Sequence, residues 1–95
     1  MKDEIERLRA EIAATDREIA RLLGRRQRLV GELSLWKLHA GLPVRDPARE
    51  ARLGELYREW AGAEGLDPAF LQRLFSAVHA ESRSLQRDSR SPRGA

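Results

Sequence analysis

The feature that most constrains this chain is an apolar stripe along its first forty residues. From Ile5 to Trp36 the stripe returns every third or fourth position, which is the periodicity of one face of a continuous helix. Proline is absent until Pro43, so nothing in this stretch breaks a helix. The pattern predicts one helix over about residues 2–39, on the order of 55 Å long at about 1.5 Å per residue.

A helix of this length is much longer than a globule of 95 residues is wide. The rest of the chain is too short to cover the whole stripe. A second copy of the chain is the simplest cover, and the sequence therefore predicts an elongated, intertwined homodimer in which the long helices of two chains pack together.

Two positions of the stripe are polar, Thr15 and Arg26. Arg26 is the costly one, because a guanidinium cannot be deprotonated and its burial without an anionic partner is strongly unfavourable. We therefore expect a negative group to meet Arg26, supplied either by a side chain or by a ligand.

The remainder of the chain carries two clear helix starts. Asp46-Pro47 and Asp67-Pro68 each place an N-cap residue before a proline at the first helical position. They predict helices over about residues 47–63 and 68–87, and so an all-α fold with three helices per chain. The helical domain is expected to span residues 1–88, followed by a disordered basic tail over 89–95. The aromatic residues expected in the core are Tyr57, Trp60, Phe70 and Phe75.

Composition excludes several classes of function. Cysteine is absent, which rules out disulfides and thiolate metal sites, and no metal-ligand spacing joins the two histidines, so no metal is expected. The charged N-terminus carries no signal-peptide core and no stretch is long enough to span a membrane, so a cytoplasmic protein with no membrane partner is expected. The net charge of +3 includes two tail arginines, which leaves 3 − 2 = +1 and argues against nucleic acid.

Each predicted helix also has polar residues where its buried face should be apolar. Arg26 and Lys37 are eleven residues apart, so they face within about 20° of each other and lie roughly 16 Å apart along the axis. Two long side chains at this spacing can close over one small anion. Lys37 is also the only lysine inside the presumed fold. The interruptions in the later helices are Arg49 and Glu50, then Ser82 and Gln86.

Each of these residues, taken alone, also has a purely structural explanation. Arg26 could pair with Glu50 in a buried salt bridge, and Ser82 could bond to its own helix backbone. His79 lacks an acid–base partner in the sequence pattern and is expected to be packed or at an edge. Because the cations outnumber the anions and the interruptions coincide in three helices, a site for an anionic ligand is the alternative.

The same residues resemble a known family, the all-helical (AroQ-type) chorismate mutases. The resemblance covers about residues 5–87 and lies in scattered residues at fixed spacing rather than in one short motif. The matching segments are Leu8-Arg9-x-x-Ile12-x-x-x-Asp16, Leu22-Leu23-Gly24-Arg25-Arg26, Lys37, Pro43-Val44-Arg45-Asp46-Pro47-Ala48-Arg49-Glu50 and Ser82-x-x-x-Gln86.

The resemblance implies a homodimer that converts chorismate to prephenate in aromatic amino-acid biosynthesis, a Claisen rearrangement that needs no cofactor. It implies that Arg26 and the other chain's Arg9 hold the substrate carboxylates, while Lys37 and Gln86 donate to the ether oxygen. It further implies that Glu50, with help near Asp46, accepts the ring hydroxyl and that Ser82 assists in binding a carboxylate. Arg49 would organise the site without contacting the reacting atoms. Within one chain, Arg9 lies about 25 Å from Arg26 along the helix and about 100° around it. Trp36, beside Lys37, is bulkier than the resemblance leads us to expect.

Three alternatives remain open at this stage. One is an isochorismate-pyruvate lyase on the same fold, although the charged pattern at Asp46, Arg49 and Glu50 favours the mutase. Another is a non-catalytic helical module that dimerises through the long helix. The third is a weak mutase that needs a partner enzyme of the shikimate pathway.

Overall fold

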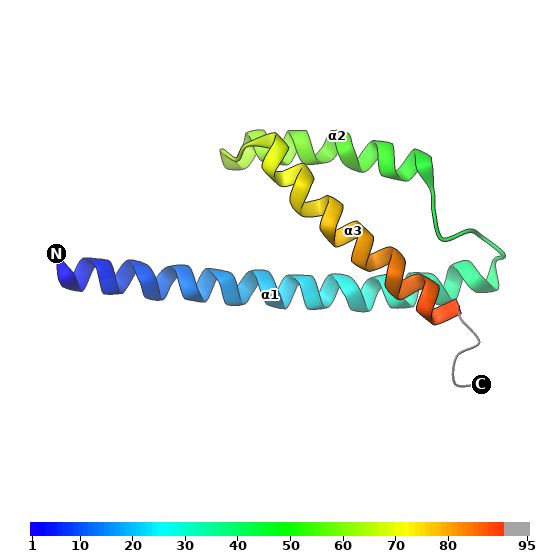
Figure 1. The fold of residues 1–95 in the computed structure, drawn as a ribbon, viewed down its shortest axis with the longest axis horizontal. Coiled ribbons are helices and arrows are strands. Elements are labelled where there is room, and N and C mark those ends of the chain that lie inside the picture. Colours follow the sequence, from blue (N-terminus) through cyan, green and yellow to red (C-terminus); the bar gives the residue numbers. More distant parts are fainter. Residues whose placement is uncertain (91–95) are drawn as a thin grey trace.

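The protein is described here by a computed structural model, which covers residues 1–90, with side chains described to residue 88. It contains three helices: α1 (Lys2–His39), α2 (Pro47–Glu64) and α3 (Pro68–Arg90). Figure 1 shows α1 as one long rod, with α2 and α3 forming a hairpin that folds back onto its C-terminal half. The predicted all-α fold with three helices is confirmed.

Local signals fix where the helices begin and end. Asp46 accepts a hydrogen bond from the Arg49 backbone N–H at 3.1 Å and so caps α2, with proline following at the first position. Asp67 accepts one from the Ala69 N–H at 3.0 Å at the start of α3. The turn after α2 uses Gly65 at φ 68°, a left-handed conformation that disfavours a side chain.

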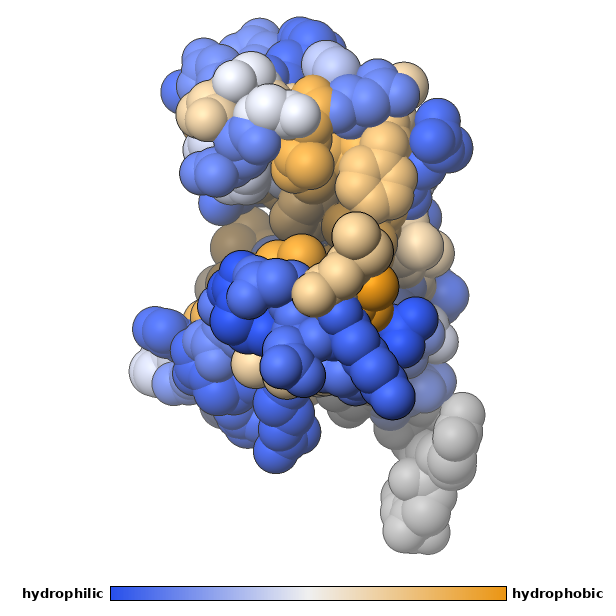
Figure 2. Space-filling model, turned by 90° about the vertical axis from the view of Figure 1, so that its left-hand side faces the viewer, coloured by the Kyte–Doolittle hydropathy of each residue, from blue (hydrophilic) through white to orange (hydrophobic). Residues whose placement is uncertain are grey.

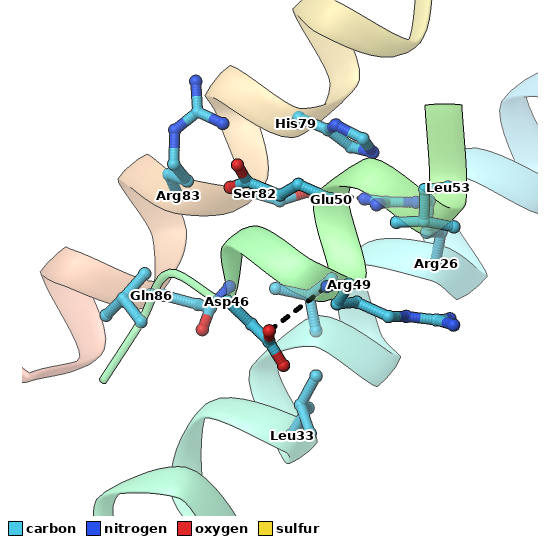
Figure 3. A pocket seen from close by; sticks show the side chains of 12 residues that line it. Arg26, Leu33, Asp46, Arg49, Glu50, Leu53, His79, Ser82, Arg83 and Gln86 are labelled. Carbon is cyan, nitrogen blue, oxygen red and sulfur yellow. Dashed lines mark hydrogen bonds between the residues drawn. The ribbon is translucent and has the colours of Figure 1, made fainter. Parts of the chain in front are cut away.

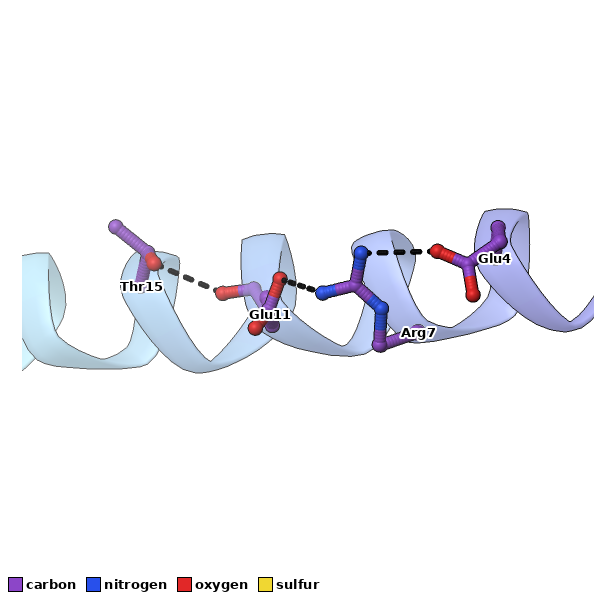
Figure 4. A network of polar contacts seen from close by, with 4 residues as sticks. All are labelled: Glu4, Arg7, Glu11 and Thr15. Atoms are coloured by element: carbon purple, nitrogen blue, oxygen red, sulfur yellow. Dashed lines mark hydrogen bonds and ion pairs between the residues drawn. The ribbon is translucent and has the colours of Figure 1, made fainter.

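The first half of α1 is held by contacts within the helix itself. Arg7 lies between two carboxylates, 3.0 Å from Glu4 and 3.1 Å from Glu11, at the three- and four-residue spacings that bring helical side chains together (Figure 4). The Thr15 hydroxyl donates to the Glu11 carbonyl at 2.8 Å. The polar group of Thr15 is therefore satisfied by its own helix.

The core of the chain lies between α2 and α3. Tyr57, Ala61 and Leu71 are buried there, with Leu53 and Phe75 packed against them. α3 also packs against α1 and so joins the long helix to the hairpin. The expectation that all four aromatic residues are core residues is wrong for this chain. Trp60 and Phe70 are 44% and 46% exposed, because the hairpin has no further layer to cover their side.

The chain is too elongated to bury its own apolar surface. Its radius of gyration is 17.4 Å, against about 12–13 Å for a compact chain of this length. Its long dimension of 58 Å matches the length predicted for α1. Figure 2 shows hydrophobic surface gathered between α1 below and the hairpin above. The large apolar side chains left exposed along the first part of α1 are Ile5, Leu8, Ile12, Ile19 and Leu22.

Two further observations concern the ends and the surface of the chain. α3 continues to Arg90, so the first two residues of the expected tail belong to a helix, while residues 91–95 lie outside the described part. Over residues 1–90, none of the helices combines the length and the apolarity that crossing a bilayer requires.

Candidate active site

A cavity of about 180 Å³ opens where the three helices and the connector meet (Figure 3). α1 lines one side, the beginning of α2 another, and the second half of α3 a third. The residues that line it are Arg26, Val30, Leu33, Val44, Asp46, Arg49, Glu50, Leu53, His79, Ser82, Arg83 and Gln86.

Six of the eight residues singled out from the sequence line this one cavity: Arg26, Asp46, Arg49, Glu50, Ser82 and Gln86. The other two, Arg9 and Lys37, lie elsewhere. Arg9 is exposed on the first part of α1 and donates to Glu6 at 3.4 Å. The helix holds Arg9 far from the cavity of its own chain, so within one chain it cannot serve that site.

Arg26 extends from α1 toward α3 and donates a hydrogen bond to the Ser82 hydroxyl. The Ser82 oxygen also lies 3.2 Å from the Gln27 side-chain oxygen and 2.9 Å from the Val78 carbonyl. Among residues 1–88, no carboxylate forms an ion pair with Arg26. The hypothesis that Glu50 pairs with Arg26 is therefore wrong, and the half-buried guanidinium faces the cavity without an anion.

Glu50 is paired instead with the connector. Arg45 donates to both of its carboxylate oxygens, from Nη2 at 2.8 Å and from Nε at 3.3 Å. This hydrogen-bonded pair holds the pKa of Glu50 below its ordinary value, and the nearby charges of Arg45 and Arg83 act in the same direction. Glu50 is thus a carboxylate whose charge is already opposed by cations.

Gln86 is buried at the foot of the cavity, with 7% of its surface exposed. Its side-chain oxygen is enclosed and has no hydrogen-bond partner among the described residues. Figure 3 shows the amide reaching from α3 toward the start of α2. The residue lines the cavity, and its amide nitrogen is a hydrogen-bond donor at every pH.

Lys37 stands beside the cavity rather than in its wall. Its ammonium donates to the Val44 carbonyl at 2.8 Å, and it lines a small hollow that shares Asp46 with the cavity. Trp36 is 68% exposed and its ring lies 6.4 Å from that of His39. The indole therefore leaves the lysine free to turn toward the connector.

Sequence reasoning missed two charged or titratable residues in the cavity wall, His79 and Arg83. A signal for them exists, because positions 79, 82, 83 and 86 are three or four apart and share one face of a helix. Once Ser82 and Gln86 were chosen as site residues, this spacing already placed His79 and Arg83 beside them. The remaining wall is apolar and comes from α1, α2 and the connector: Val30, Leu33, Val44 and Leu53.

His79 is tied to the core by a hydrogen bond. Its Nε2 lies 2.6 Å from the Tyr57 hydroxyl, and the Tyr57 ring stacks on Phe75 with centroids 4.3 Å apart. Partial burial, followed by the charges of Arg26 and Arg83, lowers the pKa of His79. Burial raises the pKa of Tyr57. The imidazole is therefore neutral at pH 7, and it is packed, as expected, with the Tyr57 hydroxyl as its polar partner.

The charges of the cavity suit a small dianion that also carries a neutral polar group. Arg26, Arg49 and Arg83 form no ion pair with any carboxylate of residues 1–88. Asp46 is engaged as the cap of α2, and Glu50 is engaged with Arg45. Unpaired guanidinium groups over apolar walls bind carboxylates strongly, because the site is partly shielded from water.

Comparison with known proteins supports the same class of site. The sequence profile of the family described as chorismate mutase type II matches residues 8–87. A T-protein from Enterobacter agglomerans is 33% identical over 88 residues, which are 93% of this chain and 24% of that protein. A bifunctional chorismate mutase/prephenate dehydratase from the same organism is 36% identical over 75 residues, which are 79% of this chain and 19% of that enzyme.

A third relative is similar in length as well. A 4-amino-4-deoxychorismate mutase from Streptomyces venezuelae is 30% identical over 80 residues, which are 84% of this chain and 78% of that protein. The structure is an all-helical domain with one cavity that gathers six of the expected residues. The chain belongs to the chorismate mutase type II family, so the resemblance found in its sequence is confirmed. It spans about a quarter or less of the two Enterobacter relatives.

The state of His79 predicts how stability responds to acid. Its pKa in the folded chain lies below the ordinary value of 6.5, so the unfolded chain binds the proton more tightly. The free energy of unfolding should therefore decrease as the pH falls from about 6.5 to about 5, and the change should be smaller in His79→Gln, which cannot titrate. Urea titrations at several pH values measure this slope.

His39→Gln is the matched control, because His39 is exposed at the end of α1. It should keep more of the wild-type slope than His79→Gln does. Equal slopes in the wild type and His79→Gln, or a wild type that becomes more stable in acid, would contradict the assignment of a neutral His79.

Proposed function

We propose that this chain is a chorismate mutase, which rearranges chorismate to prephenate. In this reaction one C–O bond breaks while a new C–C bond forms within the same molecule, so no group is transferred and the protein supplies orientation and electrostatic stabilisation. The observation that carries the proposal is the cavity itself: five residues from three helices and the cap residue of α2 gather there, in a chain of this family.

The two substrate carboxylates belong against the unpaired guanidinium groups. Arg26 takes one of them, and Ser82, already bonded to Arg26, assists. Arg49 lies on the same cavity wall as Glu50 and organises its charge. Fixing both carboxylates selects the compact conformer in which the two reacting carbons lie close, which lowers the entropic part of the barrier.

The ether oxygen belongs against Gln86 and Lys37. Negative charge collects on this oxygen as the C–O bond breaks, so a donor placed there stabilises the transition state more than the bound substrate. Gln86 lines the cavity, and its side-chain amide carries the N–H donor that this role needs. Lys37 needs only to exchange its bond to the Val44 carbonyl for one to the substrate. The ring hydroxyl then lies by Glu50, close to Asp46 at the start of α2.

The active form is a homodimer in this proposal. The exposed apolar side chains of α1 require a cover, and the hairpin exposes apolar groups of its own, among them Trp60, Phe70 and Leu74. A second chain that packs its α1 along the first would bury both surfaces. It would also bring its Arg9 to this chain's cavity as the second carboxylate ligand.

Two alternatives are weaker. Among the relatives described, two are named as mutases, which favours a mutase over a lyase or a non-catalytic module. The Streptomyces venezuelae relative is named for a substrate with an amino group in place of a hydroxyl. The cations around Glu50 favour the hydroxyl substrate for this chain.

The proposal predicts that the purified protein consumes chorismate. The consumption is measured as the loss of the ultraviolet absorbance of chorismate. Arg26→Ala should lower kcat/KM by at least about 100-fold, or roughly 3 kcal/mol, because it removes a half-buried cation that meets a carboxylate. Arg25→Ala is the matched control, since Arg25 is adjacent in sequence but exposed. A wild type without turnover, or equal losses in the two variants, would overturn the assignment.

Gln86→Glu tests the donor to the ether oxygen. A carboxylate at this position has no hydrogen to donate and repels the developing negative charge, so activity at pH 8 should fall by about 100-fold or more. Protonation restores a donor, so the variant should recover as the pH falls toward about 5, where the wild type shows no such gain. Rate measurements across this pH range give both profiles.

Gln72→Glu is the control for the added charge, because Gln72 is exposed on the same helix. It should behave like the wild type at every pH. A Gln86→Glu profile parallel to that of the wild type would remove Gln86 from the reaction.

A further inference from the structure

Arg83 is the cation of the cavity that the proposed mechanism leaves unused. It is half-buried on α3, lines the cavity and forms no ion pair with any carboxylate of residues 1–88. Its charge acts on Glu50 and on His79. Figure 3 draws Arg83 beside Ser82 at one end of the cavity, with the guanidinium of Arg49 at the other.

Charge alone decides which part of a dicarboxylate substrate lies near Glu50. In the proposed mechanism the two carboxylates lie against Arg26 and the Arg9 of the second chain, so both are directed away from the negative charge of Glu50. The group left to face Glu50 is the remaining polar substituent on the ring.

We propose that Arg83, together with Arg45, makes this site select a hydroxyl over an ammonium at that ring position. The inference rests on the proposed mutase function and extends it to substrate choice. A hydroxyl donates to the Glu50 carboxylate and can accept from a neighbouring guanidinium, so it fits a carboxylate that is already paired. An ammonium has only hydrogens to donate and carries a positive charge.

The surroundings of Glu50 penalise that positive charge. Arg45 holds both carboxylate oxygens, and Arg83 faces the same group from α3. An incoming ammonium would meet two guanidinium groups around one carboxylate, and like charges in such a partly buried site repel strongly. The distinction between a hydroxyl and an amino substrate matters among the relatives of this chain, because the Streptomyces venezuelae relative is named for the amino substrate.

Competition between the two substrates tests the proposal. The wild type should convert chorismate with a kcat/KM at least about tenfold higher than for 4-amino-4-deoxychorismate. Arg83→Met removes the charge but keeps the length of the side chain, and it should shift this ratio toward the amino substrate by about tenfold, since the ammonium then meets one cation fewer. Arg83→Lys keeps the charge and should keep the wild-type ratio.

Arg73→Met is the matched control, because Arg73 is exposed on α3 away from the cavity, and its ratio should equal that of the wild type. A wild type that converts both substrates equally, or prefers the amino substrate, overturns the inference. So does an unchanged ratio in Arg83→Met, including an equal loss on both substrates. These outcomes leave the mutase function standing, whereas a wild type that converts neither substrate overturns that function and this inference with it.

Discussion

The structure depends on the long helix α1, which lacks two partners within the described part of its own chain: a cover for its apolar stripe and an anion for Arg26. Its apolar stripe has no cover over most of its length, and Arg26 within that stripe has no carboxylate partner among residues 1–88. An exposed apolar stripe and a half-buried unpaired cation are both costly in water. In the proposed dimer a second chain would remove the first cost and a substrate carboxylate would remove the second, so dimerisation and substrate binding would satisfy neighbouring parts of one helix.

The site is built from electrostatics rather than from reactive groups. Donors and cations are fixed around a small cavity by hydrogen bonds that exist before any ligand arrives: Arg26 to Ser82, Lys37 to the Val44 carbonyl and Arg45 to Glu50. Preorganised groups stabilise developing charge at little cost in reorganisation, and of these three only Lys37 has to exchange its partner in the proposed reaction. The tie between His79 and Tyr57 extends this order into the core of the hairpin.

The helix boundaries could be predicted from the sequence because their signals are local. The cap at Asp46, the cap at Asp67 and the glycine at Gly65 act on residues within one turn. The apolar periodicity likewise gave the length of α1 and the face on which Arg26 lies. Five of the six expected residues that line the cavity stand at interruptions of a helical stripe, and the sixth, Asp46, is the cap of α2.

What the sequence could not supply depends on how distant segments cross. The partner of Glu50 is Arg45, in a connector whose path no local signal predicts, and the same connector offers the carbonyl that holds Lys37. Trp60 and Phe70 are apolar enough for a core, but the single chain has nothing to place over them.

The most direct test of the central claim combines two chains that are each inactive alone. Arg9→Ala and Arg26→Ala chains are mixed in equal amounts, and subunit exchange is verified. In each mixed dimer one site has both arginines, Arg26 from one chain and Arg9 from the other, and the second site has neither. Since about half of the dimers are mixed, the account predicts about a quarter of the wild-type chorismate mutase activity. Activity that stays at the level of the separate variants would contradict a site shared between two copies of α1.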